Sequence, residues 1–480
     1  MKVRFDWDKN KRQGIVSSDN FDDIREHFSV ENPAAKFSKY MRSFIPSRRY
    51  VITPTGRFNP GLHSLIASYA ELMYSNSEVI YTEEFTKNVS PVLKSGMSIP
   101  DLKIPLRDYQ RDIVASCLSS GRGTVILATA GGKTLTIATL IESLYISNKQ
   151  IKGILIVPDR GLVEQTYNDF AEYGVSFTFS KWTGENQLNV GTNIVICNLG
   201  ILQSTKSDID WMSHVDVCII DEVHKLRVGN KVNDLFKTIH TQNLYGFTGT
   251  MPEDLIDQWN IVGRIGPILY ERNSYELRQD KYISDVKAVV LDVKYLTSPD
   301  YSSGSPIERY RAEIEFLINN KFRNNIISSL CKKFTKNALL LVDYISHGVI
   351  LHEHLSQTCP DKKIFFIRGD VDVDDREKIK GIMEMSDNIV VVAISKIFST
   401  GINIKNIHYI VFGSGGKAKV RTIQSIGRGL RLHKGKEQLI LVDIGDSLKY
   451  GRQHLQKRLS FYEREHITYG IQTITEKPNP

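Results

Sequence analysis

The stretch "TVILATAGGKTLTIATLIESL", residues 124–144, combines three local patterns that decide the fold. Its first part, "TVILA" (124–128), is a short apolar run rich in β-branched residues, which is typical of a buried strand. The small residues "TAGG" (129–132) follow, and "KTLTIATLIESL" (133–144) has the pattern of a helix. A strand, a loop and a helix in this order form the unit from which parallel α/β sheets are built.

Similar apolar runs recur along the chain and alternate with helical stretches. A parallel strand is covered on both faces, so it lacks the alternation of polar and apolar side chains. The pattern predicts a doubly wound α/β fold in two blocks. The expected strands are 124–128, 153–157, 193–197, 216–220 and 245–249 in the first block, and 338–344, 363–367, 388–393, 407–412 and 438–444 in the second.

The chain divides by composition into three parts. Residues 1–95 have their own turn signals and a helical pattern carried by Leu65, Tyr69, Leu72 and Met73. The polar segment 295–306 contains two prolines and a glycine and reads as a linker or a surface loop. We therefore expect a small N-terminal α+β domain at 1–95, a first lobe at 96–295, and a second lobe at 296–480 that ends in a helical tail.

The bulk composition is that of an ordinary globular protein, with 41% hydrophobic and 24% charged residues in 480. A net charge of +8 slightly favours polyanionic partners, although it fits a basic protein without a nucleic-acid role equally well. Five scattered cysteines without a C-x-x-C pair favour a reducing compartment. No secretory signal or membrane span is visible, so we expect a cytoplasmic protein, in the host cytoplasm if it is phage-encoded.

The loop after the first strand resembles a phosphate-binding loop with one altered position. Gly132-Lys133-Thr134 match the end of G-x-x-x-x-G-K-[ST], but Leu127 occupies the place of the first glycine. The match alone fits a plain turn into a helix equally well, whereas the strand–loop–helix context favours phosphate binding by backbone N–H groups. The pattern predicts a site for ATP and Mg²⁺ in which Lys133 meets the β/γ-phosphates and Thr134 ligates the metal. Its residues are Thr129, Ala130, Gly131, Gly132, Lys133 and Thr134.

A second motif, "VCIIDEVHKL" (217–226), is an apolar strand that ends in two carboxylates. Asp221 at the strand end is placed to hold Mg²⁺ through water, and Glu222 to orient the attacking water. An acidic turn after a strand is common by itself. An acidic turn of the form D-E-x-H downstream of a phosphate loop is much rarer, which favours the catalytic interpretation.

A third motif, "QSIGRGLR" (424–431), lies in the second block. Arg428 and Arg431 are three residues apart and would project from one face of a helix. Arginines on a second lobe can stabilise charge on the transferring γ-phosphoryl group. A basic helix face is the simpler alternative for any single pair.

The order of these motifs, with "GFTGT" (246–250) and "STGINI" (399–404) between them, resembles superfamily 2 helicases and translocases over about residues 100–445. The resemblance implies two tandem RecA-like parallel-sheet lobes with ATP in the cleft between them. It also implies that Gln110 reads the adenine edge and that Gln424 lies near the γ-phosphate with the two arginines. By the same resemblance, His224, Thr248 and Thr250 couple hydrolysis to movement, and Ser399, Thr400 and Gly401 contact nucleic acid.

Within this superfamily the chain is similar to phage recombination and branch-migration DNA helicases of the UvsW kind. The likeness rests on Leu127 in the phosphate loop and on "SHGVILHEHL" (346–355), "IRGDVDVDDR" (367–376) and "FSTGINIKNIH" (398–408). It implies remodelling of branched or forked DNA in recombination, repair or replication, with partner proteins from those processes. An RNA helicase, the motor subunit of a restriction complex, and a non-hydrolysing DNA-binding or annealing module stay open as alternatives.

The N-terminal unit contains a basic stretch, "RSFIPSRRY" (42–50), in which arginines lie near aromatic rings. This mixture suits contact with a nucleic-acid backbone and stacking on bases, so Arg48 and Arg49 are candidate DNA contacts. A basic loop that merely caps the first lobe explains the same residues equally well.

Overall fold

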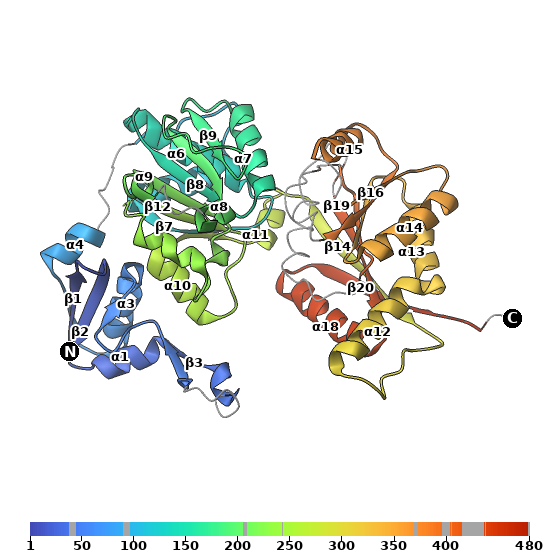
Figure 1. Ribbon diagram of the computed structural model, residues 1–480, viewed down its shortest axis with the longest axis horizontal. Coiled ribbons are helices and arrows are strands. Elements are labelled where there is room, and N and C mark those ends of the chain that lie inside the picture. Colours follow the sequence, from blue (N-terminus) through green and yellow to red (C-terminus); the bar gives the residue numbers. More distant parts are fainter. Residues whose placement is uncertain are drawn as a thin grey trace. The chain divides into compact units, whose positions relative to one another are not determined.

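The computed structural model divides into two compact units, Met1–Ala128 with Gly132–Asn273, and Ser274–Pro480 with Thr129–Gly131. Figure 1 shows the elements of each unit. The residues that the structure describes are 1–37, 45–89, 97–204, 209–241, 243–368, 373–395, 404, 406–414, 436 and 438–478.

The first unit contains a seven-stranded sheet in which every pairing is parallel. Its strands, in sheet order, are β13 (Ile268–Arg272), β7 (Arg122–Leu127), β12 (Asn243–Thr248), β11 (Val217–Asp221), β8 (Gly153–Val157), β10 (Ile194–Asn198) and β9 (Phe179–Trp182). Its helices are α5 (Asp108–Ser120), α6 (Lys133–Ser147), α7 (Arg160–Tyr173), α8 (Leu199–Ser204), α9 (Ile209–Ser213) and α10 (Leu255–Ile265), with the 3₁₀ turns η3 (Val223–Lys225) and η4 (Lys231–Lys237). Because the strands are parallel, the segments that follow β7, β11 and β12 all leave from the carboxyl edge.

The second unit contains another all-parallel sheet of seven strands. Its strands, in sheet order, are β16 (Lys363–Ile367), β17 (Ile389–Ile394), β15 (Ala338–Val342), β18 (Tyr409–Phe412), β19 (Gln438–Asp446), β14 (Asp285–Lys294) and β20 (Thr468–Thr475). Its helices are α11 (Ser274–Gln279), α12 (Pro306–Asn319), α13 (Lys321–Lys333), α14 (Ile345–Thr358), α15 (Val373–Met385) and α18 (Lys449–Arg464). The α/β class with two parallel-sheet lobes is confirmed, and each of the ten expected strands is present within two residues of its predicted ends.

Two predicted features of the second lobe need correction. β14 pairs with β19 from Asp285 to Val293, and the second unit begins at Ser274, so residues 274–295 belong to the second lobe and not to the first. The segment 295–306 is consequently a surface loop within that lobe and not a linker between lobes. The chain also does not end in a helix alone, because α18 is followed by β20, which pairs in parallel with β14.

The N-terminal region forms a small α+β layer with a four-stranded sheet in the order β5-β2-β1-β6 and a two-stranded ribbon β3-β4. Its strands are β1 (Lys2–Asp8), β2 (Gln13–Ser18), β3 (Ser29–Glu31), β4 (Arg48–Tyr50), β5 (Arg57–Phe58) and β6 (Glu78–Tyr81). Its helices are α1 (Phe21–His27), α3 (His63–Met73) and α4 (Glu83–Val89), with the 3₁₀ turns η1 (Pro33–Phe37) and η2 (Pro60–Leu62). On α3 the buried side chains are Ile66, Ala67 and Ala70, whereas the predicted apolar positions Leu65, Leu72 and Met73 are exposed.

The N-terminal layer shares its hydrophobic core with helix α10 of the first lobe. Trp259 and Val262 of α10 belong to the same buried cluster as the core of residues 3–89. The rings of Phe28 and Trp259 lie 5.5 Å apart, and Arg49 Nη2 lies 2.7 Å from Asp254 Oδ2. The layer is therefore fixed to the first lobe by apolar packing and an ion pair.

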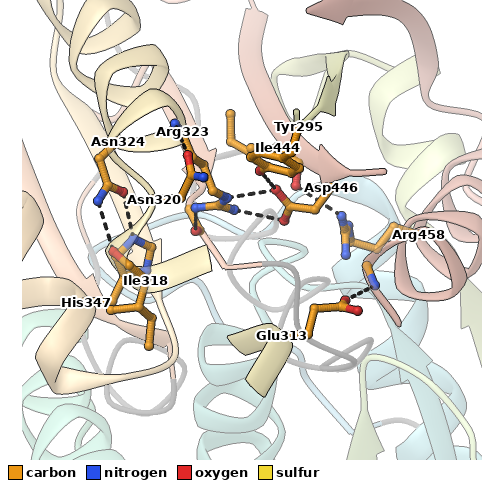
Figure 2. Close-up of polar contacts among 12 residues, drawn as sticks. Tyr295, Glu313, Ile318, Asn320, Arg323, Asn324, His347, Ile444, Asp446 and Arg458 are labelled. Atoms are coloured by element: carbon orange, nitrogen blue, oxygen red, sulfur yellow. Dashed lines mark hydrogen bonds and ion pairs between the residues drawn. The ribbon is translucent and has the colours of Figure 1, made fainter. Parts of the chain in front are cut away.

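A buried ion pair ties together the centre of the second lobe (Figure 2). Arg323 at the start of α13 binds Asp446 with Nε at 2.8 Å and Nη2 at 3.1 Å, and its Nη1 donates to Gly413 O at 2.8 Å. The Tyr295 hydroxyl also donates to Asp446. Because both charged groups are almost fully buried, the pair fixes the end of β18 against β19.

Replacing Arg323 by methionine is expected to lower the free energy of unfolding of the second lobe by about 3–5 kcal/mol, because an uncompensated carboxylate stays buried. All four tryptophans lie in the first unit, so tryptophan fluorescence would not report unfolding of the second lobe. The effect is measured instead by hydrogen exchange of β19 peptides. The matched control is Lys336→Met, which breaks the exposed pair Lys336–Asp387 and should cost less than about 1 kcal/mol. Equal hydrogen exchange of β19 in both variants would show that burial of the Asp446 carboxylate does not require the Arg323 guanidinium.

Candidate functional site

The loop between β7 and α6 has the backbone of a phosphate-binding turn. Ala130 and Gly132 have φ angles of +68° and +82°, in the left-handed region that favours glycine. At position 132 a Cβ atom would lie 2.2 Å from Gln110 Nε2, so a side chain there would clash as well as strain the backbone. Leu127 is the last residue of β7 and is fully buried in the sheet core, so its side chain stays out of the loop.

Gln110, on the first turn of α5, lies directly against this loop. Its Oε1 accepts a hydrogen bond from Arg107 N at 2.9 Å, which caps the helix and fixes the amide. The structure thus brings Gln110 and Gly132 together. Its contact with adenine stays a prediction.

Lys133, the first residue of α6, and the carboxylates after β11 face each other at the carboxyl edge of the first sheet. Lys133 Nζ lies 3.7 Å from Glu222 Oε1, and both side chains are more than four-fifths buried. Glu222 adopts a left-handed φ of +53°, and its N–H donates to Asp221 Oδ1 at 2.9 Å. Such backbone strain in a non-glycine residue is typical of functional sites.

The two adjacent carboxylates have different electrostatic environments. Burial and the neighbouring Glu222 carboxylate raise the pKa of Asp221. Burial opposes ionisation of Glu222 as well, but the Lys133 ammonium and the His224 hydrogen bond outweigh burial and lower the pKa of Glu222. Glu222 is therefore held as a carboxylate, and the charge of Asp221 is the one that a bound cation would stabilise.

A continuous chain of polar contacts leads from Glu222 to the segment after β12. His224 Nδ1 lies 3.1 Å from Glu222 Oε2 and 3.0 Å from Thr248 Oγ1. The buried Thr248 hydroxyl donates to Thr250 O at 2.9 Å, so the single Nδ1–H of His224 is shared between Thr248 Oγ1 and Glu222 Oε2 as acceptors. The structure thus joins the three residues predicted to couple hydrolysis to movement, although the coupling itself stays a prediction.

Other predicted site residues have different outcomes. The predictions for Ser399, Thr400, Gly401, Gln424, Arg428 and Arg431 lie outside the described residues. Arg48 and Arg49 are engaged within the protein, since Arg48 Nε lies 2.7 Å from Glu26 Oε1 and Arg49 pairs with Asp254. These ion pairs favour the alternative interpretation, in which the basic stretch anchors the N-terminal layer to the first lobe.

Two features near the site were not recognised in the sequence. Arg272 ends β13 opposite Leu127, and its guanidinium lies over the Tyr109 ring at 4.8 Å, beside Gln110. Only the pairing of β13 with β7 brings Arg272 there, so no local pattern could have revealed it. Asp159, directly after β8, accepts from Leu162 N at 3.1 Å and caps α7. The capping signal was present in the sequence as an acidic residue directly before a helix.

Comparisons with known proteins agree with this geometry. Residues 103–253 match the family model "Type III restriction enzyme, res subunit", and residues 320–433 match "Helicase conserved C-terminal domain". The ATP-dependent DNA helicase uvsW of Enterobacteria phage T4 is 24% identical over 95% of both chains. The DNA 3'-5' translocase XPB2 of Sulfurisphaera tokodaii is 23% identical over 71% of this chain and 81% of its own.

A solved structure of Saccharomyces cerevisiae Dbp5 bound to RNA and ADP BeF3 has a TM-score of 0.51 and 14% identity. It covers 74% of this chain and 85% of that chain, and the likeness supports the fold alone. Within the described ranges, no helix is both long and apolar enough to cross a membrane. With both helicase family models matched in order and a relative aligned almost end to end, the chain belongs to the superfamily 2 helicases and is an ATP-driven helicase.

Proposed function

We propose that this helicase remodels branched DNA, by fork regression and by branch migration of junctions, in recombination, repair or replication. The observation that carries the proposal is the extent of the similarity to the phage T4 helicase, which covers 95% of both chains. The matched family models begin only at residue 103, so the alignment takes in most of the N-terminal layer as well. The stretches 346–355, 367–376 and 398–408, on which the sequence resemblance to that helicase kind rests, point to the same assignment.

The residues at the carboxyl edge of the first sheet fit ATP and Mg²⁺. Thr134 on the first turn of α6 offers a hydroxyl and Asp221 a half-buried carboxylate, and Mg²⁺ prefers oxygen ligands. Bound Mg²⁺ would neutralise charge on the phosphate oxygens. Lys133 would bind the same phosphates, and the residues Thr129–Gly132 would donate backbone N–H groups to them.

Glu222 has the role of positioning and deprotonating the attacking water. Its side chain remains a carboxylate because Lys133 and His224 stabilise the charge. As part of the proposal, Gln424, Arg428 and Arg431 stabilise charge on the γ-phosphoryl group, and Ser399, Thr400 and Gly401 contact the DNA backbone. Hydrolysis would then be coupled to movement through His224, Thr248 and Thr250.

One alternative has a specific observation in its favour. The family model over residues 103–253 is named for the res subunit of a Type III restriction enzyme, as expected of the motor of a restriction complex. Such a motor needs a partner subunit for activity, whereas a branch-remodelling helicase acts alone. An RNA helicase is tested by the same experiment with matched RNA duplexes.

The test compares ATP hydrolysis by the purified chain with single-stranded DNA, linear duplex, a fork and a four-way junction, and follows fork regression with labelled strands. We expect the greatest stimulation by the fork and the junction, together with conversion of the fork to regressed products. Lys133→Ala serves as the control for contaminating ATPase. Equal stimulation by all DNA forms, without regression, would contradict the proposal.

A further inference from the structure

A large cleft lies between the N-terminal layer and the first lobe, within the first compact unit. It encloses about 810 Å³ and is lined by the β1–β2 turn (residues 9–12) on one side and by η4, residues 239–241 and Leu244 on the other. Arg122, the first residue of β7, and Leu244, near the start of β12, form part of its wall. The cleft is therefore at the amino edge of the first sheet.

This position separates the cleft from the ATP site. The phosphate loop follows the carboxyl end of β7, whereas Arg122 begins the same strand. A strand of this length spans roughly 20 Å at about 3.3 Å per residue. A ligand in the cleft would therefore bind without competing for the nucleotide site.

The lining is strongly basic. Five lysine and arginine side chains contribute to it and only two carboxylates do, among the residues that the structure describes. The cations are Lys9, Lys11, Arg12, Arg122 and Arg264, and the carboxylates are Glu84 and Asp234. Lys9 pairs with Glu84 at 2.9 Å, so one carboxylate is already committed.

The β1–β2 turn presents its cations on a fixed backbone. Asp8 Oδ1 accepts from the N–H groups of Asn10 at 3.0 Å and Lys11 at 3.1 Å, and Asp8 Oδ2 lies 2.6 Å from Arg57 Nε. These bonds hold the turn in one conformation, so Lys11 and Arg12 are presented to a ligand at a low cost in backbone entropy.

Two cations of the β1–β2 turn, Lys11 and Arg12, line the cleft. In the described part of the chain, no carboxylate lies within ion-pair distance of Lys11 or Arg12. On the opposite wall, burial and the charge of Arg12 lower the pKa of His240. Arg264 lies on the lobe side over the Phe236 ring. Asp234 lies close enough to Arg264 to stabilise its charge, so the uncompensated charge in the cleft is that of Lys11 and Arg12. A bound polyanion would supply the missing counter-charge.

The remaining lining suits a single strand of nucleic acid. Side-chain amides can hydrogen-bond phosphates or base edges, and two aromatic side chains form part of the wall. These residues are Asn10, Gln13, Asn59, Asn88 and Asn233, with Trp7 and Phe236. The volume is within the range of about 300–1,000 Å³ that holds a drug-sized ligand, so a few nucleotides fit and a double helix does not.

We propose that this cleft, here called the basic cleft, binds a single-stranded segment of the DNA substrate through its phosphates. The inference rests on the proposed function, because remodelling a branch releases single strands that need a path outside the ATP site. It assigns to the β1–β2 turn the DNA contact that the sequence suggested for Arg48 and Arg49.

The test is the double substitution Lys11→Gln and Arg12→Gln in the full-length chain. Binding of a fluorescent oligothymidylate is measured by anisotropy over a range of salt concentrations. We expect weaker binding by the double variant. The slope of log K against log[salt] should also be flatter by about 1.4, since each of the two lost phosphate contacts contributes roughly 0.7. Basal ATP hydrolysis should be unchanged because neither residue is near the nucleotide site.

The matched control is Lys332→Gln with Lys333→Gln, which removes the same charge from an exposed position at the end of α13. Its slope should stay at the wild-type value. If both double variants lose equal slope, the effect is one of net charge and the proposal is overturned. If the cleft variant keeps the wild-type slope and affinity, the proposal is likewise overturned. The cations of the cleft would then suit an acidic protein partner instead of DNA.

Photo-crosslinking provides a second measurement on the wild-type chain. An oligonucleotide carrying 4-thiothymidine should crosslink to peptides that contain residues 7–13 or 233–241, and crosslinks confined to other peptides would overturn the assignment. Fork regression by the wild type is scored separately. If the wild type crosslinks in the cleft but does not regress forks, the proposed function alone is rejected. If the wild type regresses forks but the cleft variant keeps the wild-type salt slope, the basic cleft alone is rejected.

Discussion

Replacement of Lys133 by alanine is expected to abolish ATP turnover and leave the fold intact. Lys133 begins α6 and its ammonium lies 3.7 Å from the Glu222 carboxylate. The substitution removes the cation that would meet the β/γ-phosphates, and it also removes the charge that lowers the pKa of Glu222. Loss of one preorganised charge of this kind costs roughly 10²–10³-fold in rate. Because the Glu222 carboxylate is also perturbed, the hydrolysis rate of the variant should fall to the level measured without enzyme.

The measurement is steady-state ATP hydrolysis at saturating DNA, with circular dichroism as the check on folding. Lys149→Ala is a matched control, because Lys149 follows the other end of the same helix and is exposed. Its rate should equal that of the wild type. Wild-type turnover in Lys133→Ala would refute the phosphate-loop assignment.

Glu222→Gln is expected to keep ATP binding and to lower hydrolysis by about two to four orders of magnitude, the usual contribution of a positioned base. An amide of the same shape can still accept a hydrogen bond from His224, but it cannot take a proton from water. Nucleotide affinity and single-turnover hydrolysis are measured on the same preparation. Loss of affinity at an unchanged rate constant would identify Glu222 as a structural residue.

A useful comparison is Glu185→Gln, which changes an exposed carboxylate that pairs only with Arg160 at 3.0 Å. Both its affinity and its hydrolysis rate should be those of the wild type. The contrast separates loss of a base from a general loss of negative charge in the first lobe.

The central strands could be predicted from the sequence because burial on both faces leaves a local signal, as in β15 and β17, where every residue is buried. The strands that were missed leave a weaker signal. β20 is mostly exposed at the edge of its sheet, and β9 has only four residues. β14 alternates exposed and buried residues at its start, so its place in the second sheet depends on pairing with β19.

The meeting of Lys133, Asp221 and Glu222 could be predicted because each lies within a few residues of a strand end, where topology alone brings them to one edge; their catalytic roles stay predictions. Partners distant in sequence could not be predicted. Arg49 pairs with Asp254, 205 residues away in the sequence. Because of this contact, the charge of Arg49 is balanced by a carboxylate of the protein itself. The basic cleft was missed for the same reason, since its walls come from residues 9–12 and 233–244.

The core shared by the N-terminal layer and α10 limits how such helicases can exchange parts during evolution or engineering. A graft cut near residue 95 would leave Trp259 and Val262 facing water on the recipient motor and would open the donor core around Phe28. A transplantable module must therefore include α10, which is separated from the layer by more than 160 residues of chain. An exchange of the layer without α10 is therefore expected to destabilise both the donor and the recipient core.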